Sequence, residues 1–437
     1  MNWDDLEPLS ARWRHEGAEH AGAINAYVAR GTREGWENAG VAPRDPRREI
    51  APQVLEVVRA ANAANEVEAL RHRFPPAYEP LMDLLPKHGT GIGPLLLLDD
   101  DSILVAVAGR GVLLVDDRGA TVLSGVLSVG RSPDRRFFAR AHSGGVDILD
   151  RWDGVVLRTL PWPTGSEGLP AGLTAAQPAG APSVSALIPF PDGRRALLVS
   201  DSGIFVLAEG GATRIHPDRE SQEESIAWSR QHYPDNPVSL SLTMAHGAIS
   251  PDGQLIAVGS QDGNHRILNG DLCEVGRVAP LVSYPHHAVF SVDGSQLAFN
   301  SCHFYAGETV GVPTALLPGL DATGEGFDER LTVIDDSCRV YAAVVRGDEY
   351  ILGDAHGYLR ARSTAGVPTW QHFLGSTISG MDISEDGRKL AVGTYGGMLH
   401  LLDLDTDHID PFAIGTATHR ERCRWLFWHD EPDVLRW

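Results

Sequence analysis

Lysine is nearly absent from this sequence: Lys87 and Lys389 are the only two, so almost all positive charge comes from arginine. This disfavours lysine-centred chemistry, and with the abundant Ala, Gly and Pro it indicates a GC-rich, bacterial gene. Cysteine is also scarce, with four residues and no Cys-x-x-Cys pair, which excludes a disulfide scaffold and a zinc ribbon. We therefore expect reduced thiols and a cytoplasmic protein.

Long apolar runs are missing as well. No stretch of about 18 apolar residues occurs in the 437-residue chain, and its first residues are acidic, so we expect neither a membrane span nor a secretory signal. The chain carries 37 Lys and Arg against 58 Asp and Glu, a formal charge of −21. Such acidity argues against binding nucleic acid through its phosphates and favours a basic protein partner.

Residues 1–85 have the pattern of a helical region. Apolar residues recur at three- and four-residue intervals from Ile50 to Leu70, which predicts one amphipathic helix ending before Pro75 and Pro76. A second helix is expected over 7–33. Because its apolar face needs a partner, we expect the region to pack against the rest of the chain rather than act as a separate binding module or a cap.

Residues 90–437 instead contain a repeat: an apolar strand, a tight turn, a second strand, a turn ending in Gly, and a third strand. The first turn occurs as Ser132-Pro-Asp-Arg135, Phe190-Pro-Asp-Gly193, Ser250-Pro-Asp-Gly253, Ser291-Val-Asp-Gly294 and Ser384-Glu-Asp-Gly387. Asp134 to Gly145 is eleven residues, and the same interval returns at Asp192, Asp252 and Asp386. A constant interval between two turns means a strand of constant length.

These units resemble the blades of WD40-type β-propellers, although the Gly-His dipeptide of that family is missing. The resemblance implies a mainly β fold, a seven-bladed β-propeller with eight blades still possible, preceded by the small helical region. We expect blades at about 94–125, 126–160, 184–217, 244–277, 286–335, 338–374 and 378–414. An eighth fragment, residues 422–428 and 434–437, is expected to close the ring against the first blade.

Three insertions interrupt the repeat, at 161–183, 218–243 and 301–313. In a four-stranded blade, links between blades and second-to-third-strand turns emerge at one end of the ring, so all three are expected there. Loops carry function more often than scaffold does. We therefore predict partner-binding residues at this end: Trp228, His232, Tyr233, Asp235, Asn236, His303, Phe304, Tyr305 and Glu308.

The sequence offers little catalytic or metal-binding chemistry. His15 and His20 are one residue too far apart for a zinc-protease helix, and the acidic segment 403–410 lacks the glycine and glutamate of a calcium loop. Cys302 and His303 are adjacent on an expected strand, so their side chains would point to opposite faces. We predict no catalytic residue, no metal and no cofactor.

Two classes of function remain. The first is a non-enzymatic protein-binding propeller, for example a bacterial immunity protein that neutralises a basic toxin. The alternative is a propeller-fold hydrolase or lyase with a central pocket, for which we expect convergence of His232, His246, His286, His303 and Glu308. A sugar- or metabolite-sensing propeller is a third option.

Overall fold

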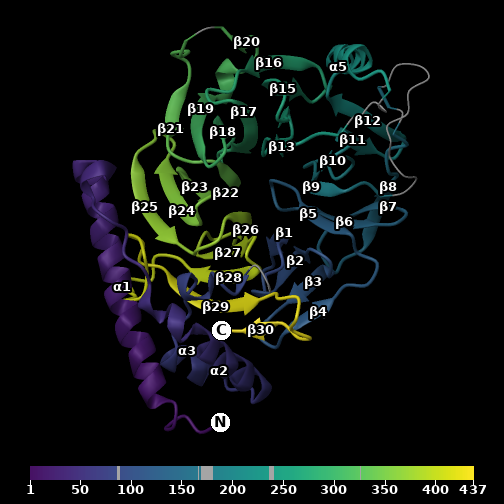
Figure 1. Ribbon diagram of the computed structural model, residues 1–437. Helices are drawn as coiled ribbons and strands as arrows, with labels where there is room; N and C mark the ends of the chain where they lie inside the picture. Colours follow the sequence, from purple (N-terminus) through teal and green to yellow (C-terminus); the bar gives the residue numbers. More distant parts are fainter. Residues whose placement is uncertain (86–88, 166, 169–180, 236–240, 325) are drawn as a thin grey trace.

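The computed structural model describes residues 1–85, 89–165, 167–168, 181–235, 241–324 and 326–437. Its β-strands form seven sheets arranged as a ring, which confirms the expected seven-bladed β-propeller (Figure 1). Each blade is built mainly from strands that follow one another in the sequence. Among these described residues, no helix combines the length and apolar character needed to cross a membrane.

The seven blades begin close to where the repeat predicts. Blade one consists of β1 (Ile92–Leu97), β2 (Ile103–Val107), β3 (Gly111–Val115) and β4 (Ala120–Val122). Blade two consists of β5 (Ser128–Arg131), β6 (Phe138–His142), β7 (Gly145–Leu149) and β8 (Val156–Leu160). Blade three consists of β9 (Val184–Pro189), β10 (Ala196–Ser200), β11 (Gly203–Ala208) and β12 (Gly211–His216). Blade four consists of β13 (His246–Ile249), β14 (Leu255–Gly259), β15 (His265–Asn269) and β16 (Glu274–Val278), to which β20 (Leu320–Ala322) is added from later in the chain. Blade five consists of β17 (Tyr284–Phe290), β18 (Gln296–His303), β19 (Ala306–Pro313) and β21 (Thr332–Asp335). Blade six consists of β22 (Val340–Arg346), β23 (Glu349–Asp354), β24 (Tyr358–Ser363) and β25 (Pro368–Phe373). Blade seven has five strands, β26 (Ile378–Ile383), β27 (Lys389–Thr394), β28 (Met398–Asp403), β29 (Arg420–Leu426) and β30 (Leu435–Arg436).

The repeated first turn has one hydrogen-bond pattern. In blade four, Ser250 Oγ donates to Asp252 Oδ1 (2.6 Å) and accepts from the backbone amide of Leu255 (2.9 Å). Gly253 has φ 72°, a left-handed conformation that glycine adopts without strain. The same serine contacts recur at Ser132, Ser291 and Ser384. The turn sequence therefore fixes where each second strand begins.

The core of the ring lies between blades. Apolar side chains of adjacent blades form shared buried clusters all the way round, including one between blade seven and blade one. Ile92 and Val105 of blade one pack there against Leu399 and Trp425 of blade seven. The ring is therefore closed by packing between complete blades.

The expected closure by the last residues is wrong. Instead of pairing with the first blade, β29 pairs with β28, and β30 pairs with β29, so both extend blade seven outward. The fourth strand of this blade lies at 420–426, beyond the expected limit of 414, because the connection 404–419 is long. The fragment that suggested an eighth blade is the outer edge of the seventh.

The helical region begins with α1 (Glu7–Glu34) and continues, after short 3₁₀ turns at Trp36–Asn38 and Pro46–Glu49, with α2 (Ala51–Ala63) and α3 (Val67–Arg73). The single helix expected over 50–74 is thus two helices. Asn65, with φ 55°, ends α2 in a left-handed conformation that asparagine tolerates, and the chain then turns into α3. A further 3₁₀ turn, Glu79–Leu81, leads to the first blade.

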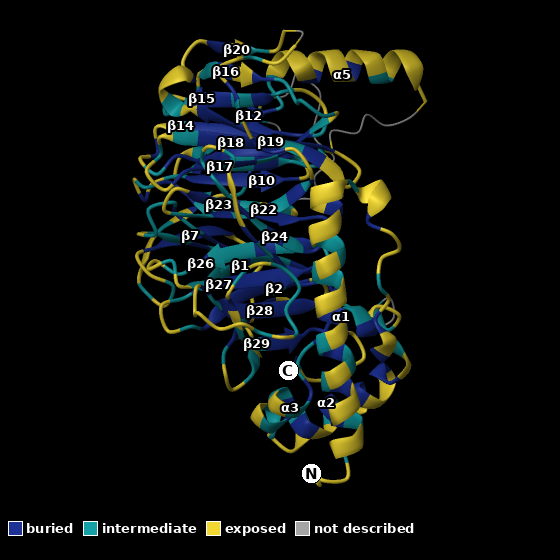
Figure 2. Ribbon diagram, turned by 90° about the vertical axis from the view of Figure 1, so that its left-hand side faces the viewer, coloured by how far each residue is buried: buried dark blue, intermediate teal, exposed yellow. Residues whose placement is uncertain are grey.

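These helices pack against the rest of the chain, as expected, and the part that they contact is blade seven. One buried cluster joins Trp13, Val58 and Phe74 of the helical region to Leu426 and Trp437 of β29 and the chain end. We call this contact the seam. Figure 2 shows α1 alongside the edge-on ring, with its outer side largely exposed. The indole Nε1 of Trp437 donates to the Phe74 carbonyl (2.6 Å), so the seam also has a directional bond.

Two of the three insertions differ from expectation. Residues 219–232 are a helix, α5 (Arg219–His232), rather than a loop, and 301–313 are the ends of β18 and β19, long strands joined by a two-residue tip at Phe304 and Tyr305. Of 161–183, residues 166 and 169–180 lie outside the described part of the chain. A longer connection, described over residues 314–324 and 326–331, follows the third strand of blade five and therefore lies at the opposite end of the ring, where β20 joins blade four in parallel with β16.

Candidate protein-binding face

The end of the ring that carries the blade-to-blade links and second-to-third-strand turns is called the loop face. Helix α5 lies here because it directly follows β12. Asp218 caps it by accepting a hydrogen bond from the backbone amide of Ser221 (2.9 Å). Its inner side buries Gln222 and Ile226. The helix is therefore anchored along one side, with its other side free for contact.

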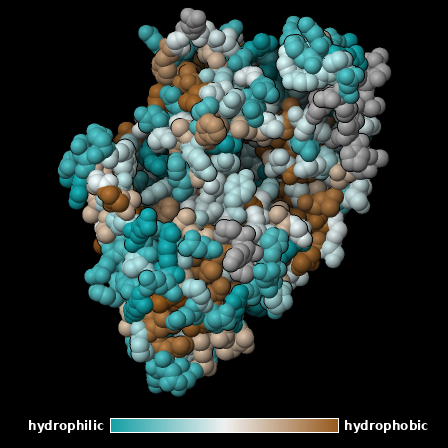
Figure 3. All heavy atoms as spheres, viewed as in Figure 1, coloured by the Kyte–Doolittle hydropathy of each residue, from teal (hydrophilic) through white to brown (hydrophobic). Residues whose placement is uncertain are grey.

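The predicted aromatic residues of α5 are exposed and lie together. Trp228 is 54% exposed and Tyr233 52%, and the Trp228 ring stacks on His232 with centroids 4.6 Å apart. Asp235 is exposed just beyond the helix, while Asn236 lies outside the described residues. In Figure 3, the region of α5 at the upper right is mostly hydrophilic. These aromatics thus form a small contact cluster on a polar surface.

The β18–β19 hairpin presents the second predicted group. Phe304 at its tip is 75% exposed and Tyr305 is 60% exposed. The His303 ring packs on Phe304, with 4.6 Å between centroids. Its Nδ1 shares a hydrogen bond with Ser283 Oγ (3.0 Å). Glu308 is separate from this tip: it is half-buried on β19 and lines a cavity of about 520 Å³ with Asp321.

The adjoining blades extend the hairpin into a larger aromatic surface that sequence reasoning missed. Tyr305 contacts His356 (5.4 Å between centroids), and Tyr341 contacts Tyr395 (5.6 Å). Tyr395 is 53% exposed. We call His303, Phe304, Tyr305, Tyr341, His356 and Tyr395, together with Arg339, the aromatic face. It spans blades five, six and seven.

Arg339 connects these rings. Its guanidinium lies over the Tyr341 ring, 4.4 Å from the centroid, and Nη1 donates to the Phe304 carbonyl (3.4 Å). Nε and Nη2 donate to His286 Nε2 at 3.0 and 2.9 Å, so His286 carries its proton on Nδ1, which donates to the Val340 carbonyl (2.6 Å). Burial, with Arg339 next, lowers the pKa of His286 to about 3. A neutral His286 therefore positions Arg339.

The arrangement expected for an enzyme is absent among the five residues proposed for it, all of which are described. His232 and His303 are exposed, Glu308 is half-buried, and His246 and His286 are buried. No two of them share a hydrogen bond; His246 Nε2 instead contacts His265 Nδ1 (3.0 Å). Burial lowers the pKa of His246 to about 4, which keeps it neutral. His246 and His286 lie near enough to interact electrostatically, but no three of the five side chains are joined by hydrogen bonds.

Cys302 and His303 are neighbours on β18 and differ in burial, as the alternation of side chains along a β-strand predicts. Cys302 is fully buried, whereas His303 is exposed. Burial raises the pKa of the Cys302 thiol, which disfavours the thiolate needed for nucleophilic attack. The pair therefore does not form a nucleophile and its base.

One group within the described residues has ligand atoms close enough for a metal: His20, Asp45 and Glu79, within 4.8 Å of one another. The positive charge there is already supplied by arginine. Arg47 donates to both carboxylate oxygens of Asp45, at 3.0 and 2.6 Å, and Arg48 pairs with Glu79 (3.3 Å). We interpret the group as an ion-pair network that fixes the helical region.

The sequence matches no protein-family model and no curated protein. Among solved structures, the β-propeller domain of Cps50 (Swd1) from Myceliophteria thermophila has 12% identity and a TM-score of 0.46, covering 70% of this chain and 92% of that one. Hydrazine synthase from Kuenenia stuttgartiensis has 14% identity and a TM-score of 0.42, covering 65% and 78%. These similarities carry no functional conclusion, and the fold assignment stands on the seven sheets of this chain.

Proposed function

We propose that this chain is a WD40-like, non-enzymatic propeller that binds a basic protein partner through the aromatic face. The observation that carries the proposal is the cluster of exposed rings at Phe304, Tyr305 and Tyr395, connected through Arg339 and Tyr341 on a rigid ring. Aromatic and arginine side chains supply most of the energy at protein interfaces, and a rigid scaffold lowers the entropy cost of ordering them.

The charge of the chain supports a basic partner. With a formal charge of −21, the protein attracts cationic molecules and accelerates their association at low salt. The aromatic rings add a second attraction, because the faces of Tyr and Phe bind guanidinium and ammonium groups. Helix α5, on the same end of the ring, exposes Glu220, Glu223 and Glu224 along with Trp228 and provides a second contact area.

One concrete form of the proposal is an immunity protein in a bacterial cytoplasm that covers a cationic toxin. It is supported by the arginine-dominated composition and the acidity, and it requires the partner to be encoded beside this chain. Among the residues proposed for the alternative hydrolase or lyase, the contacts favour no catalytic arrangement.

The test is a pull-down from the native cell with the full chain as bait, followed by affinity measurement with the captured protein. We expect Phe304→Ala combined with Tyr305→Ala and Tyr395→Ala to weaken binding by about a hundredfold, since each is a hot-spot type residue. Phe327→Ala is the matched control, because Phe327 is 52% exposed at the opposite end of the ring. Raising the salt should also weaken binding.

Two results would contradict binding through the aromatic face, and a third would contradict the basic character of the partner. A partner that binds the triple variant as tightly as the parent protein would show that the aromatic face is not the interface. A partner lost equally in Phe327→Ala would place the contact at the other end of the ring. Affinity that does not change with salt would remove the electrostatic part of the proposal while leaving the aromatic part.

A further inference from the structure

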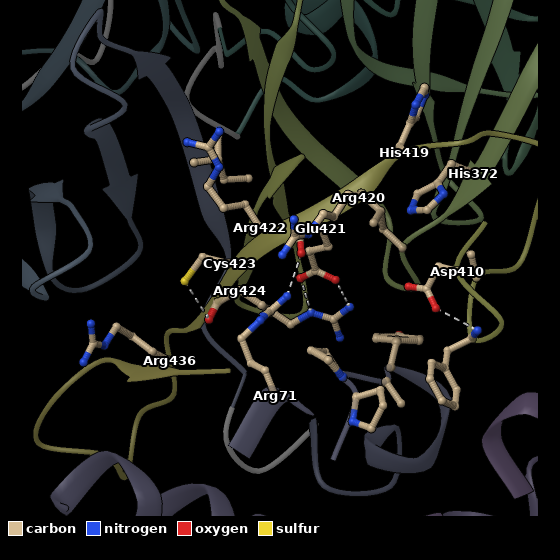
Figure 4. A pocket seen from close by; sticks show the side chains of 18 of the residues that line it. Arg71, His372, Asp410, His419, Arg420, Glu421, Arg422, Cys423, Arg424 and Arg436 are labelled. Carbon is tan, nitrogen blue, oxygen red and sulfur yellow. Dashed lines mark hydrogen bonds and ion pairs between the residues drawn. The ribbon is translucent and has the colours of Figure 1, made fainter. Parts of the chain in front are cut away.

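The cavity at the seam shows how this chain neutralises a buried arginine. This cavity has a volume of about 990 Å³, and Arg71, His372 and Arg424 are among the residues that line it. Figure 4 shows Arg424 beside Glu421 on β29. Nε and Nη2 of Arg424 each donate to the Glu421 carboxylate at 2.8 Å. The positive charge of Arg424 is therefore matched inside the chain.

Blade six contains a similar pair with a tyrosine ring added. The Arg360 guanidinium lies over the Tyr358 ring, 5.2 Å from its centroid, and Nε donates to Asp354 Oδ2 (2.7 Å). The Asp354 side chain is fully buried. Arginine, tyrosine and carboxylate thus form a unit in which the ring covers the guanidinium and the carboxylate balances its charge.

Arg339, on the aromatic face, has the tyrosine of this unit but not the carboxylate. Its guanidinium lies over the Tyr341 ring, 4.4 Å from the centroid. All three of its side-chain hydrogen bonds go to neutral acceptors: two to His286 Nε2 and one to the Phe304 carbonyl. Within the described residues, Arg339 therefore has no ion-pair partner.

The carboxylates just before Arg339 in the chain do not balance its charge. Asp335 pairs with Arg362 instead, at 2.7 Å between Nη2 and Oδ2. Asp336 is exposed and makes no ion pair with Arg339. An arginine whose charge is unmatched at a protein surface is suited to pair with a carboxylate supplied from outside the chain.

The Arg339 guanidinium is held in place and still has donors to offer. An arginine side chain has five N–H groups, and the three hydrogen bonds leave one N–H on Nη1 and one on Nη2 without an acceptor in the described chain. The bond from Nη1 to the Phe304 carbonyl lies at the exposed surface. A ligand would therefore meet a guanidinium that is already ordered, which lowers the entropy cost of binding.

We propose that Arg339 is the carboxylate-binding anchor of the aromatic face: the partner places an Asp or Glu side chain, flanked by basic residues, against Nη1 and Nη2. The carboxylate would complete Arg339 as Asp354 completes Arg360. This inference rests on the proposed protein-binding function and adds a feature of the partner. The acidity of the chain attracts the basic residues over a distance, whereas Arg339 selects the acid at contact.

The test is calorimetric titration of the full chain, at low salt, with two capped peptides, Lys-Lys-Glu-Phe-Lys-Lys and the same peptide with Gln in place of Glu. We expect the Glu peptide to bind at least about fivefold more tightly, since only it forms a charged pair with Arg339. The two peptides should bind equally to Arg339→Met. Arg339→Lys should restore part of the difference, because an ammonium keeps the charge but not the planar fork.

Arg388→Met is the matched control. Arg388 is exposed in the turn between β26 and β27, at the end of the ring opposite the aromatic face, and its replacement removes the same charge. The preference for the Glu peptide should be unchanged in this variant. Each variant is compared with the parent by far-ultraviolet circular dichroism, and if Arg339→Met is unfolded, Arg339→Lys decides by a reduced preference for the Glu peptide.

Three outcomes would overturn the inference: no binding of either peptide at millimolar concentration, equal binding of both to the parent protein, or a preference for the Glu peptide that persists in the Arg339 variants. The failure of this inference can be told from failure of the proposed function. If both peptides bind equally and Tyr395→Ala weakens both, the aromatic face is a contact surface and only the carboxylate anchor is wrong. If neither binds, the pull-down still decides the proposed function.

Discussion

The ring and the seam are held together in different ways. In the ring, each buried cluster joins neighbouring blades, and most paired strands are adjacent in the sequence. At the seam, Trp13 and Phe74 meet Trp437, residues separated by more than 360 positions. The ring is therefore specified by a local pattern that recurs from blade to blade, whereas the seam depends on individual contacts made once.

This difference predicts where single substitutions do most damage. A ring cluster is one of several similar clusters, but the seam has one cluster, in which the tilted rings of Trp13 and Trp437 pack with centroids 6.0 Å apart. Loss of a large side chain there leaves a cavity in the one cluster that joins the helical region to the propeller. The helical region would then lose its main apolar partner on the propeller.

The largest expected effect is therefore that of Trp437→Ala. This side chain is fully buried, and its removal should lower the free energy of unfolding by about 3–5 kcal/mol, as for other buried aromatic residues. Urea unfolding followed by circular dichroism measures the change. Trp36→Ala is the control, because Trp36 is 57% exposed and should change stability by about 0.5 kcal/mol or less.

Equal stabilities for Trp437→Ala and Trp36→Ala would show that the seam contributes little to the folded state. Two separate unfolding transitions in the parent protein would show instead that the helical region and the propeller unfold independently. That second result would support the division into residues 1–85 and 90–437, which remains a prediction.

Acid should destabilise both regions through buried neutral histidines. His246 and His286 in the ring have pKa values lowered by burial to about 4 and about 3, and His372 beside the seam has one lowered to about 3. The unfolded chain takes up these protons below about pH 6.5, while the folded chain does not. Stability is thus fully present above that pH and is lost as the pH falls.

The expected slope is about 1.4 kcal/mol per pH unit for each such histidine between about pH 6 and pH 4.5. Urea unfolding at several pH values measures it, and hydrogen exchange shows which region opens first. Stability that is constant over this range would mean that the histidines are already protonated in the folded protein.

The ring could be predicted because turn chemistry and strand length repeat in the sequence. The serine–aspartate–glycine turns mark the starts of second strands, and the eleven-residue interval marks their ends. The outer strands of blade seven could not be placed in the same way, because β29 follows a long link without that spacing. Asn65 likewise gives only a weak local signal for the break between α2 and α3.

The candidate sites show the same limit. Phe304 and Tyr305 could be predicted as contact residues because they lie in an insertion that interrupts the repeat. Tyr395 and His356 lie in second turns of ordinary length, so no sequence feature marks them as contact residues. Alignment of those turns, each just before Gly397 or Gly357, would have placed them beside the hairpin. No local pattern predicts the cavity at the seam, since Arg71, His372 and Arg424 line it together only through the tertiary fold.

The smallest effect tests the repeat itself. Gly387 has φ 68°, so Gly387→Ala should cost about 1 kcal/mol by forcing an L residue into the left-handed region. Blade two already has Arg135 there, with φ 62°, and its guanidinium donates to the Ile383 carbonyl (2.8 Å) across the ring. Arg135→Gly should therefore change stability less than Gly387→Ala, because relief of backbone strain offsets the lost bond. If Arg135→Gly is the more damaging of the two, contacts across the ring outweigh the turn conformation that defines the repeat.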